Sequence, residues 1–115
     1  MLRESGKIEK RSYNLNGTID PTVDSGVDHG NVLFDFAIAV ASNKPDLDGA
    51  RDALVTAMGS PAVVTASLTA ATFSLLDRIA NGIGISLDAP VLQGSADFRE
   101  ELGINAYPSA ANSLR

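Results

Sequence analysis

The 115-residue sequence contains no cysteine and no tryptophan, and aromatic residues make up only 5% of it. Without cysteine the chain can form no disulfide, no thiolate nucleophile and no thiolate metal site. The absence fits a reducing compartment, so we expect a cytoplasmic protein. His29 is the only histidine, and therefore the only side chain that ordinarily titrates near neutral pH. The composition thus excludes thiol chemistry and leaves little for acid–base chemistry.

Positive charge is also scarce. Nine lysines and arginines stand against 14 acidic residues, for a formal net charge of −5. This balance argues against nucleic acid and anionic membrane surfaces as partners. The N-terminus is charged and has no apolar run, so we expect no signal peptide. We also expect no metal and no cofactor.

An uncharged stretch from Ser60 to Leu76 organises the rest of the chain. Ser60 is a good N-cap and Pro61 suits the first helical position, so the pattern predicts a helix over about Pro61 to Asn81. Its apolar residues fall in two rows that cover most of the circumference: Val64, Leu68, Ala71, Leu75 and Ile79, then Ala62, Ala66, Ala70, Phe73, Leu76, Ala80 and Ile83.

A helix that is apolar almost all round is usually buried, so we expect this one to be the most buried element. Phe73 should then lie in the core, and Phe73→Ala should cost about 3–5 kcal/mol. The uncharged run is shorter than the roughly 20 residues that a bilayer requires, which argues against a membrane span.

The flanking sequence predicts an all-α protein, a small helical bundle around this long central helix with irregular arms at both ends. We expect a single domain, with an N-terminal arm over 1–27, a helical core over 28–103 and a C-terminal tail over 104–115. Further helices are expected over about Asn31–Ser42, from a cap at Asp46 or Asp48 to Met58, and over Ala96–Leu102. Turn formers between Ser12 and Val27 leave two alternatives, a short strand or hairpin and an extended arm wrapped over a neighbouring subunit.

Two residues are candidates for a catalytic site. His29 lies just before a helix, where its side chain can act as base or acid, with Asp24 and Asp28 near enough to orient it; the alternative is a surface or capping histidine. Arg78 interrupts an apolar helix and can bind an anion in a cleft. The alternative for Arg78 is a structural pair with Asp77.

One segment resembles a known family. The stretch A-L-V-T-A-M-G-S-P-A-V-V-T-A-S-L-T-A-A-T-F-S-L-L-D-R-I-A-N-G-I-G-I-S-L-D, within about Arg51 to Pro90, is similar to the C-terminal half of AhpD-like proteins of the carboxymuconolactone decarboxylase superfamily. The residues that carry the likeness are Ala71, Phe73, Arg78, Ile79, Ala80, Gly84, Ile85, Leu87 and Asp88. The resemblance implies an all-helical fold that usually forms homo-oligomers. For the better-known members it also implies hydroperoxide reduction or decarboxylation of a small lactone acid.

Two functions remain open. The first is a non-catalytic helical protein that forms a homo-oligomer, since a chain this short cannot easily cover a helix that is apolar on nearly every side. The second is a cofactor-free enzyme of decarboxylase or isomerase type that acts on a small anionic substrate through His29 and Arg78. Partners are therefore a second copy of the chain and, for the second function, a small anionic ligand. We favour the first.

The missing cysteine pair gives a direct prediction about activity. Peroxidase members of the family carry a C-x-x-C pair, and no residue of this chain can form a sulfenic acid. Hydroperoxide turnover with a dithiol donor should therefore equal the buffer control under metal-free conditions. Turnover above that control would contradict the prediction.

Overall fold

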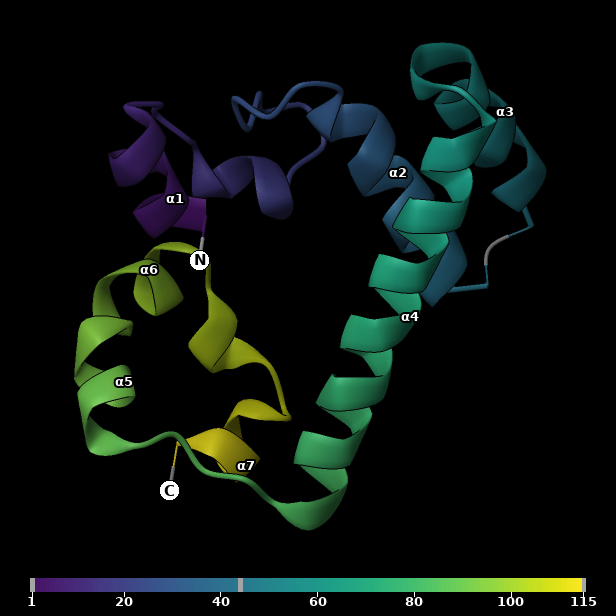
Figure 1. The fold of residues 1–115 in the computed structure, drawn as a ribbon. Coiled ribbons are helices and arrows are strands. Elements are labelled where there is room, and N and C mark those ends of the chain that lie inside the picture. The colour runs from purple at the N-terminus through teal and green to yellow at the C-terminus, as the bar shows by residue number, and fades with distance from the viewer. Residues whose placement is uncertain (1, 44, 115) are drawn as a thin grey trace. The chain divides into compact units, whose positions relative to one another are not determined.

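The structure, a computed structural model, describes residues 2–43 and 45–114 and is helical throughout, with no strand in those two ranges (Figure 1). Its α-helices and 3-10 helices (η) are, in chain order, α1 (Leu2–Glu9), η1 (Leu15–Thr18), α2 (Gly30–Ala41), α3 (Leu47–Met58), α4 (Ser60–Ile83), α5 (Ala89–Gly94), α6 (Ala96–Glu101), η2 (Ile104–Ala106) and α7 (Ala110–Ser113). The predicted all-α class, a small helical bundle, is confirmed.

The chain divides into two compact units, residues 1–72 and 73–115, and the boundary falls within α4. The division into arm, core and tail is a different partition, and it stays a prediction. In the first unit α2 packs extensively against α3. Phe36 and Ala39 of α2 and Leu54 of α3 are the buried hydrophobic residues of the described chain. The hydrophobic core is therefore small and lies in this helix pair.

The N-terminal segment is more ordered than the sequence suggests. The charged stretch at its start forms α1, and the region expected as a strand, hairpin or extended arm instead forms η1 followed by turns. Gly17 in η1 allows the backbone of Ser25 to approach closely, since a Cβ on Gly17 would lie 2.7 Å from it. A hydrogen bond from Asn14 N to Ser25 O, 3.0 Å long, holds the same approach. The short polar side chains therefore make local turns rather than a ladder.

Glycines with positive φ follow α3 and α4. Gly59 follows α3 with φ 84° and Gly84 follows α4 with φ 70°, both in the left-handed region that glycine enters without penalty. Ile85 N donates to Ala80 O over 3.0 Å, the six-residue bond of a Schellman cap. The helix observed at Ser60–Ile83 is slightly longer than the predicted one.

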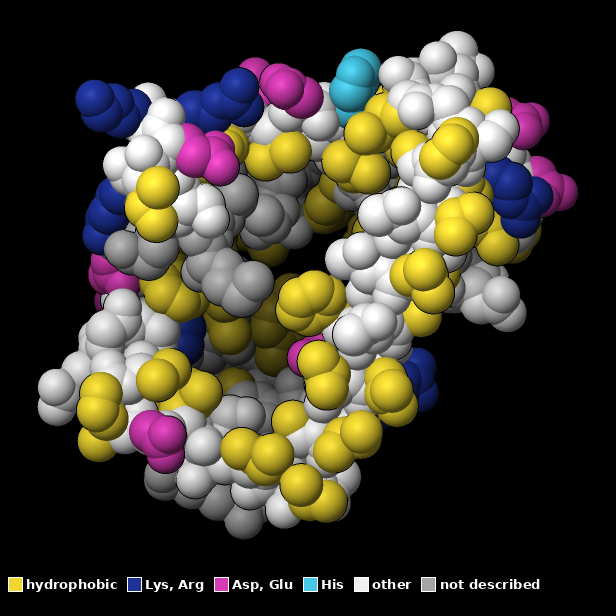
Figure 2. Space-filling model, viewed as in Figure 1, with side chains coloured by type: hydrophobic (Ala, Val, Ile, Leu, Met, Phe, Trp, Pro, Cys, Tyr) yellow, Lys and Arg dark blue, Asp and Glu magenta, His cyan; other side chains and the backbone are white. Residues whose placement is uncertain are grey.

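The expectation that the central helix is the most buried element is wrong for the single chain. No residue of α4 is buried, and α4 packs extensively against no other described element. Phe73 is 53% exposed, so it lies outside the core and the large cost expected for its truncation does not follow. Figure 2 shows hydrophobic side chains on the exposed surface of α4. The sequence showed which residues are apolar but not what covers them.

The helix α4 is long and apolar enough to span a bilayer, as far as length and composition go. Its most apolar window of 18 residues has a mean hydropathy of 1.3, and none of that window is buried. Core helices of oligomers satisfy the same two criteria. The absence of a membrane partner therefore remains a prediction.

The second unit is built from short helices. After α4, Asp88 takes the N-cap position of a further helix, α5, whose first turn contains Pro90. The predicted short helix is present as α6, and Gly103 follows it with φ 65°. The tail, expected as coil, contains η2 and α7. Single turns such as these have too few residues for a periodic pattern to indicate them.

The packing of α2 against α3 predicts where the chain is sensitive to truncation. Leu54 is 0% exposed, so Leu54→Ala should lower the free energy of unfolding by about 2–5 kcal/mol, the range for large-to-small core changes. Val55→Ala, the matched change at the next and exposed position, should cost about 1 kcal/mol or less. Chemical denaturation measures both, and equal costs would show that α3 does not pack through Leu54.

Candidate functional site

A cavity of about 310 Å³ lies in the second unit. Its lining comes from the end of α4, the exit after it, α6, η2, the following turn and α7: Asp77, Ala80, Asn81, Leu87, Arg99, Ile104, Asn105, Tyr107, Ser109, Ala110, Ser113 and Leu114. The volume is at the lower end of the range for small-molecule sites. The lining combines one cation, one carboxylate, neutral hydroxyls and amides, and aliphatic side chains.

Arg99 is the chemically distinctive member of this lining. The residue is 9% exposed, and no nitrogen of its side chain is both buried and without a hydrogen-bond partner. Its Nη2 donates to Leu92 O over 2.8 Å and its Nε donates to Ser95 O over 3.3 Å. Both acceptors are backbone carbonyls, and Arg99 pairs with no carboxylate among residues 2–43 and 45–114. The chain therefore buries a fixed positive charge without a counter-charge in its described part.

The junction of α5 and α6 fixes this arginine. Ser95 ends α5 and precedes α6, and its buried hydroxyl donates to Val91 O over 2.6 Å instead of capping α6. The Ser95 carbonyl accepts both the backbone N–H and the Nε of Arg99. A guanidinium held at two points on rigid backbone has little rotamer freedom left to lose when it binds a ligand.

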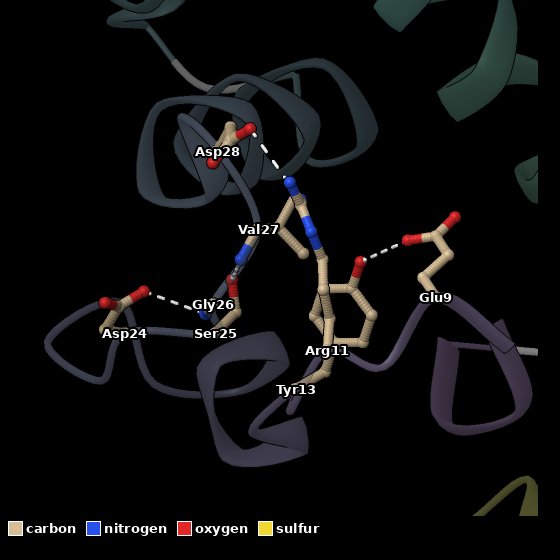
Figure 3. A network of polar contacts seen from close by, with 8 residues as sticks. All are labelled: Glu9, Arg11, Tyr13, Asp24, Ser25, Gly26, Val27 and Asp28. Carbon is tan, nitrogen blue, oxygen red and sulfur yellow. Dashed lines mark hydrogen bonds and ion pairs between the residues drawn. The ribbon is translucent and has the colours of Figure 1, made fainter. Parts of the chain in front are cut away.

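The structure places His29 at the N-cap position of α2, exposed and in the left-handed region with φ 57°. Its side chain makes no capping hydrogen bond. The two carboxylates expected to orient it bind elsewhere (Figure 3): Asp28 pairs with Arg11 over 3.9 Å, and Asp24 accepts from Gly26 N over 2.8 Å. His29 therefore has no orienting carboxylate in the observed geometry, and its catalytic role stays a prediction.

Arg78 belongs to the second unit and is exposed. Its Nε donates to the Ser74 hydroxyl over 3.3 Å, and no ion pair joins it to Asp77 in the described chain. Neither Arg78 nor His29 lines the cavity around Arg99. The role of Arg78 as an anion clamp also stays a prediction.

A second cavity, of about 330 Å³, lies in the first unit between α2 and α3. Asp35 and Asp46 are its charged lining residues, and the rest of the lining is Val32, Ala39, Gly49, Ala50 and Ala53. Over residues 2–43 and 45–114, no three His, Cys, Asp or Glu side chains gather closely enough to hold a metal ion. The described lining of this cavity contains no cation, and its ionisable groups are the two carboxylates of Asp35 and Asp46.

Two pKa shifts fall in the polar network before α2. A hydrogen bond with Tyr13, and then the carboxylate of Asp28, raise the pKa of Arg11. Hydrogen bonds from the hydroxyl and then the backbone N–H of Thr22 lower the pKa of Asp20. Both shifted groups are exposed, so these shifts reflect local turn and network contacts rather than a catalytic environment.

Comparison with protein families, with curated proteins and with solved structures gives no match for this chain. The resemblance to AhpD-like proteins therefore stays a prediction. Function has to be argued from the geometry above.

Sequence reasoning did not find Arg99. It lies in the stretch D-F-R-E-E, which has the composition of an exposed short helix, and its acidic neighbours suggest a solvated surface. Its Nη2 donates to the Leu92 carbonyl of α5, a helix that no periodic pattern indicated, and its Nε donates to the backbone carbonyl of Ser95. No signal in the sequence distinguishes it from an exposed arginine.

The backbone at His29 gives a prediction that separates a structural from a catalytic histidine. Glycine enters the left-handed region freely, whereas a β-branched side chain is strained there. His29→Val should therefore lower the free energy of unfolding by about 1–2 kcal/mol relative to His29→Gly. Chemical denaturation of the two variants measures this, and equal stability would mean that His29 does not hold the left-handed conformation in solution.

Proposed function

We propose that this chain is a non-catalytic helical protein that associates with itself through α4, as a relative of AhpD-like proteins. The observation that supports the proposal is the exposure of α4. Leu68 and Leu75 are 65% and 58% exposed in the single chain. A contiguous apolar surface of this kind on a globular chain is typical of an interface.

Exposed apolar residues of α4 form two rows. Val64, Leu68, Ala71, Leu75 and Ile79 recur at intervals of three and four, which puts them in a stripe along the helix, here called the α4 seam. Phe73, Leu76 and Ile83 are also exposed and belong to the second row. The charged side chains of Asp77 and Arg78, both exposed within α4, are costly in a bilayer, so the helix favours a second copy over a lipid surface.

The seam suits an isologous contact. Ala71 lies at its middle, so two antiparallel copies of α4 would place their alanines at the two-fold axis and approach closely there. Ala66 and Ala70 are also small residues of α4, but they are partly shielded within the single chain. The hydroxyls of Thr69 and Thr72 donate to carbonyls four residues back, so they do not need partners across the contact.

The alternative function, an enzyme that uses His29 and Arg78, receives no support from the geometry. The two side chains lie in different units and both are exposed. Arg78 donates to the hydroxyl of Ser74 on its own helix, and His29 makes no capping hydrogen bond with its side chain. We therefore do not advance it.

Charged side chains introduced into the seam should dissociate the oligomer. Leu68→Glu with Leu75→Glu keeps good helix formers but would bury two carboxylates at the contact, which should weaken association on the order of 100-fold or more. Size exclusion coupled to light scattering should give a dimer or larger for the natural chain at micromolar concentration and a monomer for the double variant.

Ile8→Glu provides the matched control, because Ile8 is an apolar residue on α1 that is 84% exposed and lies outside the seam. This variant should keep the mass of the natural assembly. A folded natural chain with monomer mass contradicts the proposal. Flotation of the natural chain with neutral phosphatidylcholine vesicles also contradicts it, since a bilayer would then be what covers α4.

A further inference from the structure

We propose that the cavity around Arg99 binds a small organic monocarboxylate. The starting point is the arginine itself, because a guanidinium carries a positive charge and five N–H donors. A buried charge is costly unless it is matched. The carbonyls of Leu92 and Ser95 take one Nη2 hydrogen and the Nε hydrogen, which leaves the Nη1 amino group unused by the described chain.

Arg99, which carries the unused N–H donors, lines the cavity, and its guanidinium can bind both oxygens of a carboxylate.

Neutral hydrogen-bond donors also line the cavity. The amides of Asn81 and Asn105 and the hydroxyls of Ser109 and Ser113 are of the kind that orient a bound oxyanion without adding net charge. The cavity thus combines a cation fixed to backbone carbonyls with neutral polar groups.

Asp77 offsets part of the attraction between Arg99 and an anion. It lines the cavity without pairing with Arg99, so an entering anion meets one positive and one negative charge. For a dianion the attraction to Arg99 and the repulsion by Asp77 both double, so a second ligand charge gains only the difference between them. Ligand charge therefore does not decide the ligand class alone, and the rest of the lining contributes to the choice.

The aliphatic part of the lining indicates the rest of the ligand. Leu87, Ile104 and Leu114 line the cavity together with two alanines. Apolar surface of this kind contributes affinity only to a ligand with a hydrocarbon body. Benzoate combines one carboxylate with such a body, whereas acetate has almost none and phosphate has neither property.

The test titrates the natural full-length chain separately with benzoate, acetate and inorganic phosphate, and follows amide chemical shifts by two-dimensional NMR. Benzoate should shift amides of the cavity lining in a saturable way. Acetate should bind more weakly, and phosphate should not saturate in the same range. No saturable shift with benzoate, or equal binding of benzoate and phosphate, overturns the proposal.

Two variants test how the charges of Arg99 and Asp77 affect benzoate binding. Arg99→Gln should weaken benzoate binding by at least about tenfold, since it removes a charged hydrogen-bond donor. Asp77→Asn is an exposed change that should tighten benzoate binding by about two- to fivefold, because it removes a like charge. Arg51→Gln is the control, because it removes an exposed arginine of the first unit that lies outside the lining, and it should leave benzoate affinity unchanged.

Far-ultraviolet circular dichroism shows whether Arg99→Gln keeps its helices. If it folds and binds benzoate like the natural chain, the proposal is wrong. If it does not fold, Asp77→Asn decides alone, because unchanged or weaker benzoate binding in that variant is contrary to a monocarboxylate site beside Asp77. None of these outcomes depends on the oligomeric state, so failure here is distinct from failure of the α4 contact.

Discussion

The hydrophobic contact between α2 and α3 is the interaction on which the first unit depends, and α4 takes no comparable part in it. Phe36 and Leu54 are enclosed there, while the large apolar side chains of the longest helix stay exposed. Helices without tertiary packing are marginal in water. A 24-residue helix with alanines, a proline start and a Schellman end has local reasons to form. In the single chain its large apolar side chains nevertheless stay exposed to water. That exposure is the basis of the proposed self-association.

The second unit follows a different principle. The described chain has its buried hydrophobic residues in α2 and α3, whereas the buried side chains of the second unit are those of Ser95 and Arg99. Hydrogen bonds to backbone carbonyls, rather than an apolar core, hold the centre of this unit. Polar centres are rigid only when every group is satisfied. A carboxylate bound to Arg99 would supply the missing partner and would also stabilise the unit by mass action.

Helices with a clear period or clear end signals could be predicted from the sequence. Pro61, Gly59 and Gly103 fixed ends of α4, α3 and α6 to within about two residues, as caps usually allow. The helices of the N-terminal segment and of the tail were missed, because one or two turns carry no readable period and depend on contacts made elsewhere. Asp88 before Pro90 was a readable start signal for α5.

Burial and the site were harder to foresee. Apolar rows on α4 indicated that something must cover the helix, but a pattern cannot distinguish the chain's own core from a second copy. His29 and Arg78 were singled out because of their chemistry and their position in sequence. Arg99 could not be singled out, since its side chain binds the Leu92 carbonyl of α5, a helix that the sequence pattern did not predict.

The most direct test of the account is amide hydrogen exchange of α4 as a function of protein concentration. If a second copy covers the seam, protection of the amides from Leu68 to Leu75 should rise as the concentration increases through the association range, while protection in α2 and α3 stays constant. Protection in α4 that is the same at every concentration, in a protein that is folded throughout, would contradict the account.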